Sequence, residues 1–579
     1  MKNKNQQEKL NQLRHSCSHL LAAAVLELWP NTKPTIGPAI ENGFYYDFEF
    51  QENISEEDLP KIEKKMREIL PTWESFSHRE VSADEAKAFY KNNPYKLELI
   101  DEIIKKGEKI TFYKAGKFED LCRGGHVDHP NKEIGAFKLL SLAGAYWRGS
   151  EKNKMLTRIY GTAFPTQKEL NEYLLMLEEA KKRDHKKLGQ QLGLFMFHET
   201  APGMPYWLPK GVIIYNELIN FWREEHYNRG YQEIMSPLLN KKALYETSGH
   251  WEHYRENMFV VETEEKEVYG IKAMNCPNAM IVFGSSSRSY RDLPLRLGDT
   301  DTLHRYERSG TLNGLLRVRE FRQDDAHIFV TEEQIKSEYQ NIFAIVEKFY
   351  SIFKISYSFR LGTRPEKYMG DLKTWNKAET ALKEILKESG KEYTIEEGDG
   401  AFYGPKIDIL MKDSLGRSWQ MGTIQLDFQQ PKNFNLRYTD IDGKEKMPVV
   451  IHRVVYGSLE RFIGILLEHF AGAFPIWLSP IQVMLLPIAD RHVEYAQETA
   501  DKLRRAKIRV SIDTRSETLQ AKIREATLQK VPILGIIGDK EIDQNSISVR
   551  LRNGEDQGQV EISQFIQRLR EDIDKKTQS

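Results

Sequence analysis

The spacing of apolar and polar residues changes near residue 185 and again near residue 480. In the first stretch, helix-periodic segments such as 56–70 and 82–90 alternate with short apolar runs such as 43–50, which predicts an α+β domain. Residues 167–190 are charged and helix-periodic, and they predict a helical connection between two folded units.

The middle and the end of the chain differ in how strands follow one another. An amphipathic helix is predicted over 211–230, followed by the strand-like YQEIMSP and by the β-rich runs FYGPKIDIL and SWQMGTIQLDF, which predict a large, mainly antiparallel sheet with helices. After Pro480, the strand-like runs IQVMLLPI, IRVSID and VPILGIIGD alternate with helical patterns, which predicts a small α/β domain with a mostly parallel sheet. We therefore expect a multidomain α+β and α/β protein with domains at 1–185, 186–479 and 480–579.

Composition narrows the class of protein. Hydrophobic residues make up 40% of the 579 residues and charged residues 29%, as in ordinary globular proteins. With 84 Lys and Arg against 85 Asp and Glu, net charge does not favour nucleic-acid binding, so any RNA contact must come from local patches. No apolar run reaches the roughly 20 residues that cross a bilayer, and the polar start MKNKNQQEKLNQ lacks the apolar region of a secretory signal. We expect a cytoplasmic protein without a membrane partner.

The three cysteines are too few and odd in number for a disulfide framework, so each is judged by its neighbours. Cys276 lies in AMNCPNAM, and the histidines His327 and His452 lie in RQDDAHIFV and VVIHRVVYGS. No two of these residues have a compact zinc-finger spacing. Taken singly, each could equally be a buried thiol or a core histidine.

Arginines surround one of these segments. The stretch RYERSGTLNGLLRVREFRQDDAHIF contains two β-like runs, glycines at the turn, and Arg305, Arg308, Arg317, Arg319 and Arg322. Guanidinium groups pair bidentately with phosphate oxygens, so such a hairpin suits a polyphosphate; a salt-bridged surface hairpin is the other interpretation.

The N-terminal part carries a second candidate site. RHSCSHLLAAAV places His15 and His19 four residues apart, on one face of a predicted helix, and DLCRGGHVDHP places Cys122 and His126 around a glycine turn. Two such pairs suit a tetrahedral zinc site, and buried core histidines are the other interpretation. Cys17, inside the first motif, is expected to be a packed thiol.

Several long segments resemble a known family. GYQEIMSPLL, RYERSG through FRQDDAHIF, and GSLERF resemble the three signature motifs of class II aminoacyl-tRNA synthetases, in that order. MNCP, QDDAHIF, AFYGPKID and GSLERFIGILLEHFAGAFPIWLSP resemble threonyl-tRNA synthetases in particular, and the resemblance runs from about Leu13 to about Leu569. It implies a class II catalytic domain with an antiparallel sheet, an α+β editing domain before it and an α/β anticodon-binding domain after it.

The resemblance also implies an activity. It is the ATP-dependent joining of threonine to tRNA(Thr) by a homodimer, with hydrolysis of mischarged Ser-tRNA(Thr). Zn²⁺ would be bound by Cys276, His327 and His452, and Mg²⁺ would accompany ATP. Zinc with an open position can select the threonine hydroxyl that valine lacks, whereas serine keeps that hydroxyl, so a second, hydrolytic site is needed.

Individual roles follow from the same resemblance. Arg305 would contact the α-phosphate of ATP and Arg461 the outer phosphates, and His250, in TSGHW, would take the proton from the tRNA ribose. Glu307 would lie near the adenine amino group, and Phe321 and Arg461 would sandwich the ring. The further residues of this pocket would be Arg317, Gln323, Asp325 (for the threonine ammonium), Tyr403, Lys406, Gln420, Gln425 and Ser458. The editing site would comprise His15, His19, Asp120, Cys122 and His126, and the anticodon contacts would be Glu541, Arg550 and Arg552.

The chain departs from the family pattern in places. It has CPNA where the family often has CPGH, and VREFRQDD where the family has VRGFTQDD, which puts Glu320 and Arg322 beside the proposed pocket. It begins shortly before HSCSH, so we expect it to lack the small domain that commonly precedes the editing domain. The alternative function is a synthetase-like, RNA-binding regulatory paralogue, which should have lost zinc ligands or ATP arginines; this chain has them all.

Overall fold

The computed structural model describes residues 2–577, which form two compact units, Met1–Glu178 and Glu179–Ser579. The boundary falls within helix α6 (Gln167–Lys182). The predicted helical connection is divided, since a second helix, α7 (His185–Leu192), begins after Asp184, whose side chain accepts the backbone N–H groups of the first turn. Across the described part of the chain, no helix combines the length and the apolar character needed to cross a membrane.

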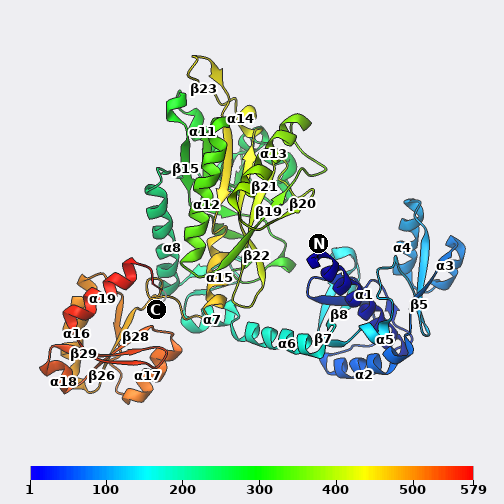
Figure 1. Ribbon diagram of the computed structural model, residues 1–579, viewed down its shortest axis with the longest axis horizontal. Coiled ribbons are helices and arrows are strands. Elements are labelled where there is room, and N and C mark those ends of the chain that lie inside the picture. Colours follow the sequence, from blue (N-terminus) through cyan, green and yellow to red (C-terminus); the bar gives the residue numbers. More distant parts are fainter. Residues whose placement is uncertain (1, 578–579) are drawn as a thin grey trace. The chain divides into compact units, whose positions relative to one another are not determined.

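The first unit is an α+β fold (Figure 1). Helix α1 (Lys2–Leu28) packs against α2 (Leu59–Ile69) and against an antiparallel sheet of order β1-β3-β8-β7. The strands of this sheet are β1 (Lys33–Pro34), β3 (Gly43–Glu49), β8 (Met155–Phe164) and β7 (Ala136–Tyr146). A smaller sheet combines β4 (Ser77–Val81), β5 (Ile110–Ala115) and β6 (Phe118–Leu121), with α3 (Ala83–Phe89) and α4 (Pro94–Lys105) preceding β5.

The second unit is built on a long sheet of order β11-β15-β18-β25-β22-β21-β19-β20. Its strands are β11 (Gln232–Glu233), β15 (Leu295–Asp299), β18 (Asp325–Val330), β25 (Val449–Val454), β22 (Ser418–Asp427), β21 (Lys406–Lys412), β19 (Ser356–Gly362) and β20 (Tyr393–Glu396). Only the outermost pair at each edge of the described sheet is parallel, as predicted for a mainly antiparallel sheet. The two central strands β18 and β25 are buried along their whole length, polar residues included.

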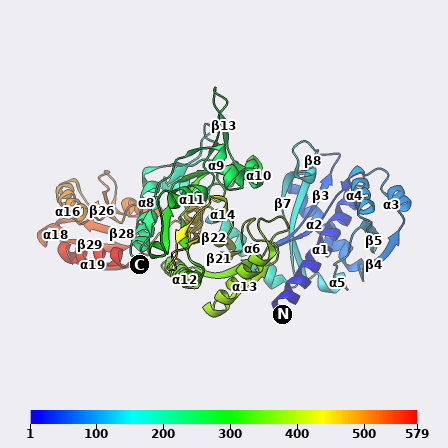
Figure 2. The ribbon, with the colours of Figure 1, turned by 90° about the horizontal axis from the view of Figure 1, so that it is seen from above.

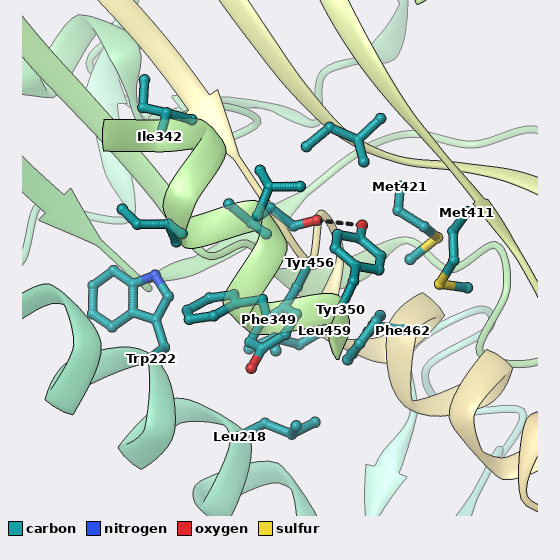
Figure 3. Close-up of a cluster of buried hydrophobic side chains, with 14 of the residues drawn as sticks. Leu218, Trp222, Ile342, Phe349, Tyr350, Met411, Met421, Tyr456, Leu459 and Phe462 are labelled. Atoms are coloured by element: carbon teal, nitrogen blue, oxygen red, sulfur yellow. Dashed lines mark hydrogen bonds between the residues drawn. The ribbon is translucent and has the colours of Figure 1, made fainter. Parts of the chain in front are cut away.

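Helices cover the apolar face of this sheet. They are α8 (Pro209–Tyr227), α12 (Ile335–Ser351), α13 (Leu372–Ser389) and α15 (Leu459–His469). In the core, Trp222 of α8, Phe349 of α12 and Phe462 of α15 gather around the same strands (Figure 3). The Tyr350 hydroxyl donates a hydrogen bond of 2.8 Å to the carbonyl of Val455, which fixes α12 against the chain just after β25. A separate small sheet, β12 (Leu239–Lys241), β14 (Val268–Ile271) and β13 (Val260–Glu262), ends in a loop that projects beside β13 (Figure 2).

The C-terminal part contains a sheet of order β27-β26-β28-β29-β30. Its strands are β27 (Val510–Ile512), β26 (Val483–Pro487), β28 (Ile533–Ile537), β29 (Ser546–Leu551) and β30 (Asp556–Glu561). Helices α16 (Val493–Arg505) and α19 (Ile562–Asp574) pack in one core, and α17 (Leu519–Leu528) packs in a second.

The prediction of a mostly parallel C-terminal sheet is wrong in detail. Strands β27, β26 and β28 are parallel neighbours, but β28, β29 and β30 pair antiparallel. The connection from β28 to β29 contains only the short helix α18 (Asp539–Asp543). A parallel crossover needs a dozen or more residues, so this short connection requires the antiparallel arrangement.

Candidate functional site

Three donor side chains from distant segments meet at the centre of the long sheet. Cys276 begins helix α11 (Cys276–Gly284), and His327 and His452 lie directly opposite each other on β18 and β25. The ligand atoms of these three buried residues lie within 4.8 Å of one another. One thiol and two imidazoles are the donor types that Zn²⁺ prefers, and three protein ligands leave a position for a substrate.

The surroundings of the two histidines fit a metal. Nδ1 of His327 is buried and has no hydrogen-bond partner among residues 2–577. Nε2 of His452 lies 2.9 Å from Oδ2 of the fully buried Asp427, which leaves the other ring nitrogen free for a ligand bond. Metal-bound histidines usually donate their second N–H to such a carboxylate. The three side chains therefore fit zinc both in their donor atoms and in the hydrogen bond that orients His452.

Predicted amino-acid-binding residues lie next to this cluster. Asp325 is two residues from His327 on β18 and thus on the same face of the strand. Burial raises the pKa of Asp325 to about 6, and the side-chain amide of Asn275 donates to it at 3.3 Å. The Tyr403 hydroxyl donates at 2.5 Å to Gln425, which is the register partner of His452 on β22. Carboxylate, phenol and amide thus surround the donor cluster.

His250 also lies beside the cluster. It begins the short helix α10 (His250–His253), its Nδ1 is 2.9 Å from the Ser248 hydroxyl, and its Nε2 is 3.7 Å from the Cys276 sulfur. Burial lowers the pKa of His250 to about 3. The imidazole is therefore a neutral, oriented ring at the edge of the site.

The predicted nucleotide arginines approach the site from two segments. The guanidinium of Arg305 lies 5.1 Å from the ring centroid of Phe321, and its Nε donates to the carbonyl of Ala273 at 3.2 Å. Arg317 is paired with Glu307 at 2.9 Å. Burial lowers the pKa of Arg461, and the positive charge of Arg317 lowers it further. Two guanidiniums that repel each other in this way form a site suited to phosphate oxygens.

The remaining residues predicted for this pocket make hydrogen bonds or ion pairs with other residues of the protein. Ser458 caps α15 by accepting the backbone N–H of Arg461 at 3.2 Å, and the backbones of Gln323 and Ser458 form an isolated β-bridge. The Lys406 ammonium lies 3.0 Å from Asp399, and Gln420 accepts a bond of 2.8 Å from Arg360.

Glu320 and Arg322, the two departures from the family pattern that lie beside the pocket, each contact a neighbouring side chain. Glu320, on β17 (Glu320–Arg322), pairs with His304 at 3.2 Å. The guanidinium of Arg322 lies 5.8 Å from the Tyr215 ring centroid. Both side chains therefore have protein partners beside the pocket.

The N-terminal unit brings its own four donors together. The ligand atoms of His15, His19, Cys122 and His126 lie within 4.8 Å of one another. The Cys122 sulfur is 3.3 Å from Nε2 of His126 and 3.6 Å from Nε2 of His15. Burial raises the pKa of Cys122 to about 11 and lowers the pKa of His126 to about 2. Neutral imidazoles and a thiol suit either a metal or a hydrolytic pocket, so the geometry leaves both interpretations open. The expected packed thiol, Cys17, is fully buried.

Asp120 lies beside this cluster and is bound by residues outside it. Its carboxylate accepts hydrogen bonds from the hydroxyls of Tyr46 (2.6 Å) and Tyr90 (2.8 Å) and pairs with the Lys96 ammonium at 2.6 Å. It lies 3.7 Å from His19. The sequence did not point to Lys96 or the two tyrosines, because a lysine in an amphipathic helix is usually solvated, whereas Lys96 is only 2% exposed.

The predicted anticodon residues differ in availability. Arg552 donates at 2.6 Å to the carbonyl of Phe474, and Glu541 binds the backbone N–H of Gly538 and the hydroxyl of Ser548, each at 2.8 Å. The Arg550 side chain is partly exposed and has no hydrogen bond or ion pair within the described residues. Of the three, Arg550 is the one most available to a ligand.

Comparison with known proteins agrees with this arrangement. Three family profiles match: "tRNA synthetase class II core domain (G, H, P, S and T)" over residues 259–470, "Anticodon binding domain" over 482–572, and "Threonyl and Alanyl tRNA synthetase second additional domain" over 110–160. The threonine–tRNA ligases of Thermotoga neapolitana and Carboxydothermus hydrogenoformans are each 52% identical to this chain over 97% of its length, covering 88% and 89% of theirs.

The chain belongs to the threonine–tRNA ligase family. A solved structure described as the RNA binding domain of threonyl-tRNA synthetase from Cryptosporidium parvum Iowa II is similar at 41% identity and a TM-score of 0.66, covering 68% of this chain and 99% of that one. The predicted family, fold class and enzyme class are therefore confirmed, and the ligase is favoured over the regulatory paralogue. The assignment of individual site residues, the three domain boundaries, zinc and the homodimer stay predictions.

Proposed function

We propose that this chain activates threonine with ATP, transfers it to tRNA(Thr), and hydrolyses Ser-tRNA(Thr) at the donor cluster of its N-terminal unit. The observation that carries the proposal is the convergence of Cys276, His327 and His452 beside Asp325, in a chain of this family. The chain works in the cytoplasm as a homodimer, with one Zn²⁺ in each catalytic site and Mg²⁺ bound with ATP.

Threonine selection rests on the triad and its neighbours. Cys276, His327 and His452 would hold the zinc, which would supply a Lewis acid for the amino and hydroxyl groups of threonine. Asp325 accepts a hydrogen bond from the amino group of the substrate, and its burial keeps water from competing for this contact. Tyr403 and Gln425, already hydrogen-bonded to each other, form the adjoining wall. A site that requires a hydroxyl can reject valine by about 10⁴-fold or more, which an apolar pocket cannot do.

Activation is an in-line attack of the threonine carboxylate on the α-phosphorus of ATP, with pyrophosphate leaving. Arg305 neutralises charge on the α-phosphate, and Arg461 with Arg317 holds the outer phosphates. Phe321 and Arg461 enclose the adenine, and Glu307 lies at its amino group. Gln323, Lys406, Gln420 and Ser458 complete the walls. Such chemistry needs little covalent help, so the fixed guanidiniums supply most of the rate enhancement.

Transfer to tRNA requires that the terminal ribose hydroxyl lose a proton as it attacks the acyl carbon of the adenylate, while the bond from this carbon to the phosphate oxygen breaks and AMP leaves. His250 is the residue proposed for this step, because its neutral ring is oriented by Ser248 at the edge of the site.

Editing follows because serine retains the hydroxyl used for selection, and a missing methyl group can be discriminated by only about 1–3 kcal/mol. His15, His19, Cys122 and His126 bind the mischarged end and orient the attacking water. Asp120, whose carboxylate lies 3.7 Å from His19 and pairs with Lys96, is proposed to position this water or act as its base. We further propose that the anticodon is read by Glu541, Arg550 and Arg552. The three domains would occupy residues 1–185, 186–479 and 480–579.

The deciding experiment is ATP–pyrophosphate exchange with each amino acid in turn. We expect exchange with threonine, weaker exchange with serine and none above background with valine. Exchange that prefers another amino acid, or no exchange in a folded protein that binds tRNA(Thr), would contradict the proposal.

A further inference from the structure

Arg461 rests on an aromatic ring that the roles given above do not use. Its guanidinium lies 5.6 Å from the ring centroid of Trp419, and its Nε is buried without a hydrogen-bond partner in the described chain. A long arginine side chain has many rotamers, so contact with a fixed indole restricts where the guanidinium can lie. The position of Arg461 therefore depends on how firmly Trp419 is held.

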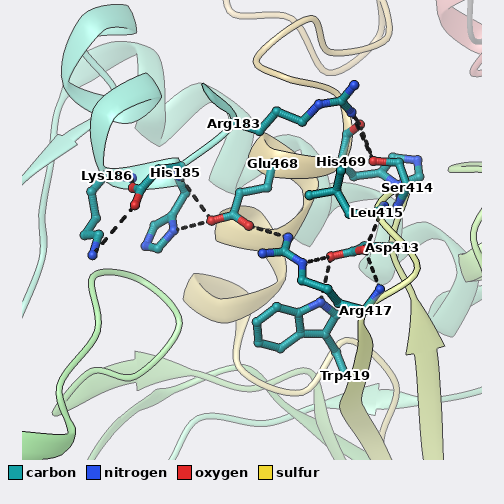
Figure 4. Close-up of polar contacts among 11 residues, drawn as sticks. Arg183, His185, Lys186, Asp413, Ser414, Leu415, Arg417, Trp419, Glu468 and His469 are labelled. Atoms are coloured by element: carbon teal, nitrogen blue, oxygen red, sulfur yellow. Dashed lines mark hydrogen bonds and ion pairs between the residues drawn. The ribbon is translucent and has the colours of Figure 1, made fainter. Parts of the chain in front are cut away.

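Trp419 is held by a buried carboxylate (Figure 4). Its indole N–H donates at 2.9 Å to Oδ2 of Asp413, and the same oxygen accepts from Nε of Arg417 at 2.6 Å. Oδ1 of Asp413 accepts the backbone N–H groups of Leu415 and Arg417. All these residues belong to the turn between β21 and β22 and the first residues of β22, so the turn and the indole form one rigid piece.

The network continues from this turn to α15 and α7. Arg417 also donates from Nη2 to Glu468, near the end of α15, at 2.5 Å. The other oxygen of Glu468 accepts both the backbone N–H and Nδ1–H of His185, at 3.2 and 2.8 Å. Figure 4 shows Glu468 lying between His185 and Arg417. One buried carboxylate thus joins the start of α7 to the turn that carries Trp419.

His185 also contacts the loop that carries Arg317, the second arginine proposed to bind the phosphates. Its Nε2 accepts the backbone N–H of Leu315 at 3.1 Å, two residues before Arg317. The approach is close, because a Cβ on Gly314, whose φ is +50°, would lie 2.2 Å from Nε2 of His185. Glycine is therefore required there both for its backbone conformation and for space.

We propose that the chain His185–Glu468–Arg417–Asp413 is a positioning network for ATP, which fixes Arg461 through Trp419 and the Arg317 loop through Leu315. None of these four residues touches substrate, and Trp419 acts through Arg461. The inference rests on the proposed function, since it assumes that Arg461 binds the phosphates. It adds that the segment leading out of α6 is a structural part of the nucleotide site.

A matched pair of substitutions tests the role of the indole. Trp419→Phe and Trp419→Leu both lose the N–H bond to Asp413, but only phenylalanine keeps an aromatic face for Arg461. We expect Trp419→Leu to raise the KM for ATP about 5- to 30-fold in pyrophosphate exchange, as for a lost cation–π contact, and Trp419→Phe to raise it less. The KM for threonine should change less than about twofold in both, since a positioning loss confined to ATP leaves threonine contacts intact.

A double-mutant cycle with Arg461→Ala separates positioning from general destabilisation. If Trp419 acts through Arg461, the effect of Trp419→Leu should disappear in the Arg461→Ala background, because the interaction is already gone. Glu468→Gln should give a smaller increase in KM for ATP, and circular dichroism should show that each variant is folded.

Three outcomes would overturn the inference. These are equal losses for ATP and threonine, additive effects of Trp419→Leu and Arg461→Ala, or an unaltered KM for ATP in both Trp419→Leu and Glu468→Gln. If Trp419→Leu fails to fold, Trp419→Phe and Glu468→Gln carry the test. The premise that Arg461 binds the phosphates fails separately, if Arg461→Ala alone leaves exchange near the wild-type rate. The proposed function itself fails if the wild type does not exchange with threonine.

Discussion

Asp427 controls the nitrogen that His452 can offer to a metal, and Asp427→Asn tests this with almost no change in shape. The carboxylate is fully buried and uses both oxygens: Oδ1 accepts the N–H groups of Gln429 (2.7 Å) and Gln430 (3.1 Å), and Oδ2 binds Nε2 of His452. An amide has one oxygen, so its NH₂ must face one of these two partners. If it faces His452, the imidazole proton moves to Nδ1, and that nitrogen can no longer bind zinc.

The expected loss of zinc affinity can be estimated from other metal sites. Removing a carboxylate that hydrogen-bonds a metal-binding histidine typically lowers the affinity for the metal 10- to 100-fold. We expect the Kd for zinc to rise by about that factor in Asp427→Asn, which corresponds to about 1.4–2.7 kcal/mol. Cys276→Ser, which removes a direct ligand, should lose more. The exposed Asp442→Asn should bind zinc as the wild type does, since the Asp442 carboxylate contacts the side chain and the backbone N–H of Lys444, not the donor cluster.

The assay is competition for zinc with a chelator of known affinity on purified, full-length protein. The spectrum of the Co²⁺-substituted protein should shift in Asp427→Asn, while thermal unfolding checks the fold. A Kd within about twofold of the wild type, in a protein where Cys276→Ser does lower zinc affinity, would refute the reasoning.

Two further predictions concern catalysis and editing. Arg305→Ala and Arg461→Ala should each lower pyrophosphate exchange by about 10²- to 10³-fold without unfolding the protein, because each removes fixed charge from the phosphates; near wild-type exchange would contradict these assignments. The double variant His15→Ala with His19→Ala should charge threonine normally but accumulate Ser-tRNA(Thr), measured by hydrolysis of preformed Ser-tRNA. Equal hydrolysis by wild type and variant would assign another role to the N-terminal cluster. Zinc that Cys276→Ser retains, and that is lost when His15 and His19 are also replaced, would identify this cluster as a metal site.

Local patterns predicted most of the fold because local chemistry determines the ends of its elements. Asp184 and Ser458 are N-caps, and each begins its helix by accepting backbone N–H groups. The order of strands in the sheets is different, because it depends on pairing between segments far apart in sequence. The mostly parallel sheet expected after Pro480 was wrong for the pairings of β28 with β29 and of β29 with β30 for this reason: the strand-like runs were visible, but their partners were not.

In the candidate site, too, local sequence indicated less than the pairing of distant segments. Cys276, His327 and His452 have no diagnostic spacing, so the resemblance alone singled them out, and the pairing of β18 with β25 explains why they meet. Asp413 and Lys96 were not foreseen, because a charged residue in a turn or an amphipathic helix is usually solvated. Lys96 is buried against Asp120, which lies on another element, and Asp413 is buried by Arg417 and Trp419 of its own turn. Hydrophobic periodicity reveals neither pairing.

The pairing of His327 with His452 also bears on redesign of this protein. Side chains alternate across a strand, so a slip of one residue in β25 would remove His452 from the face of His327 and present Ile451 or Arg453 there. A chain folded in the wrong register would therefore lack one of its three donors. In any loop-shortened or circularly permuted version, stoichiometric zinc would report that the central strands had paired correctly, before any substrate was added.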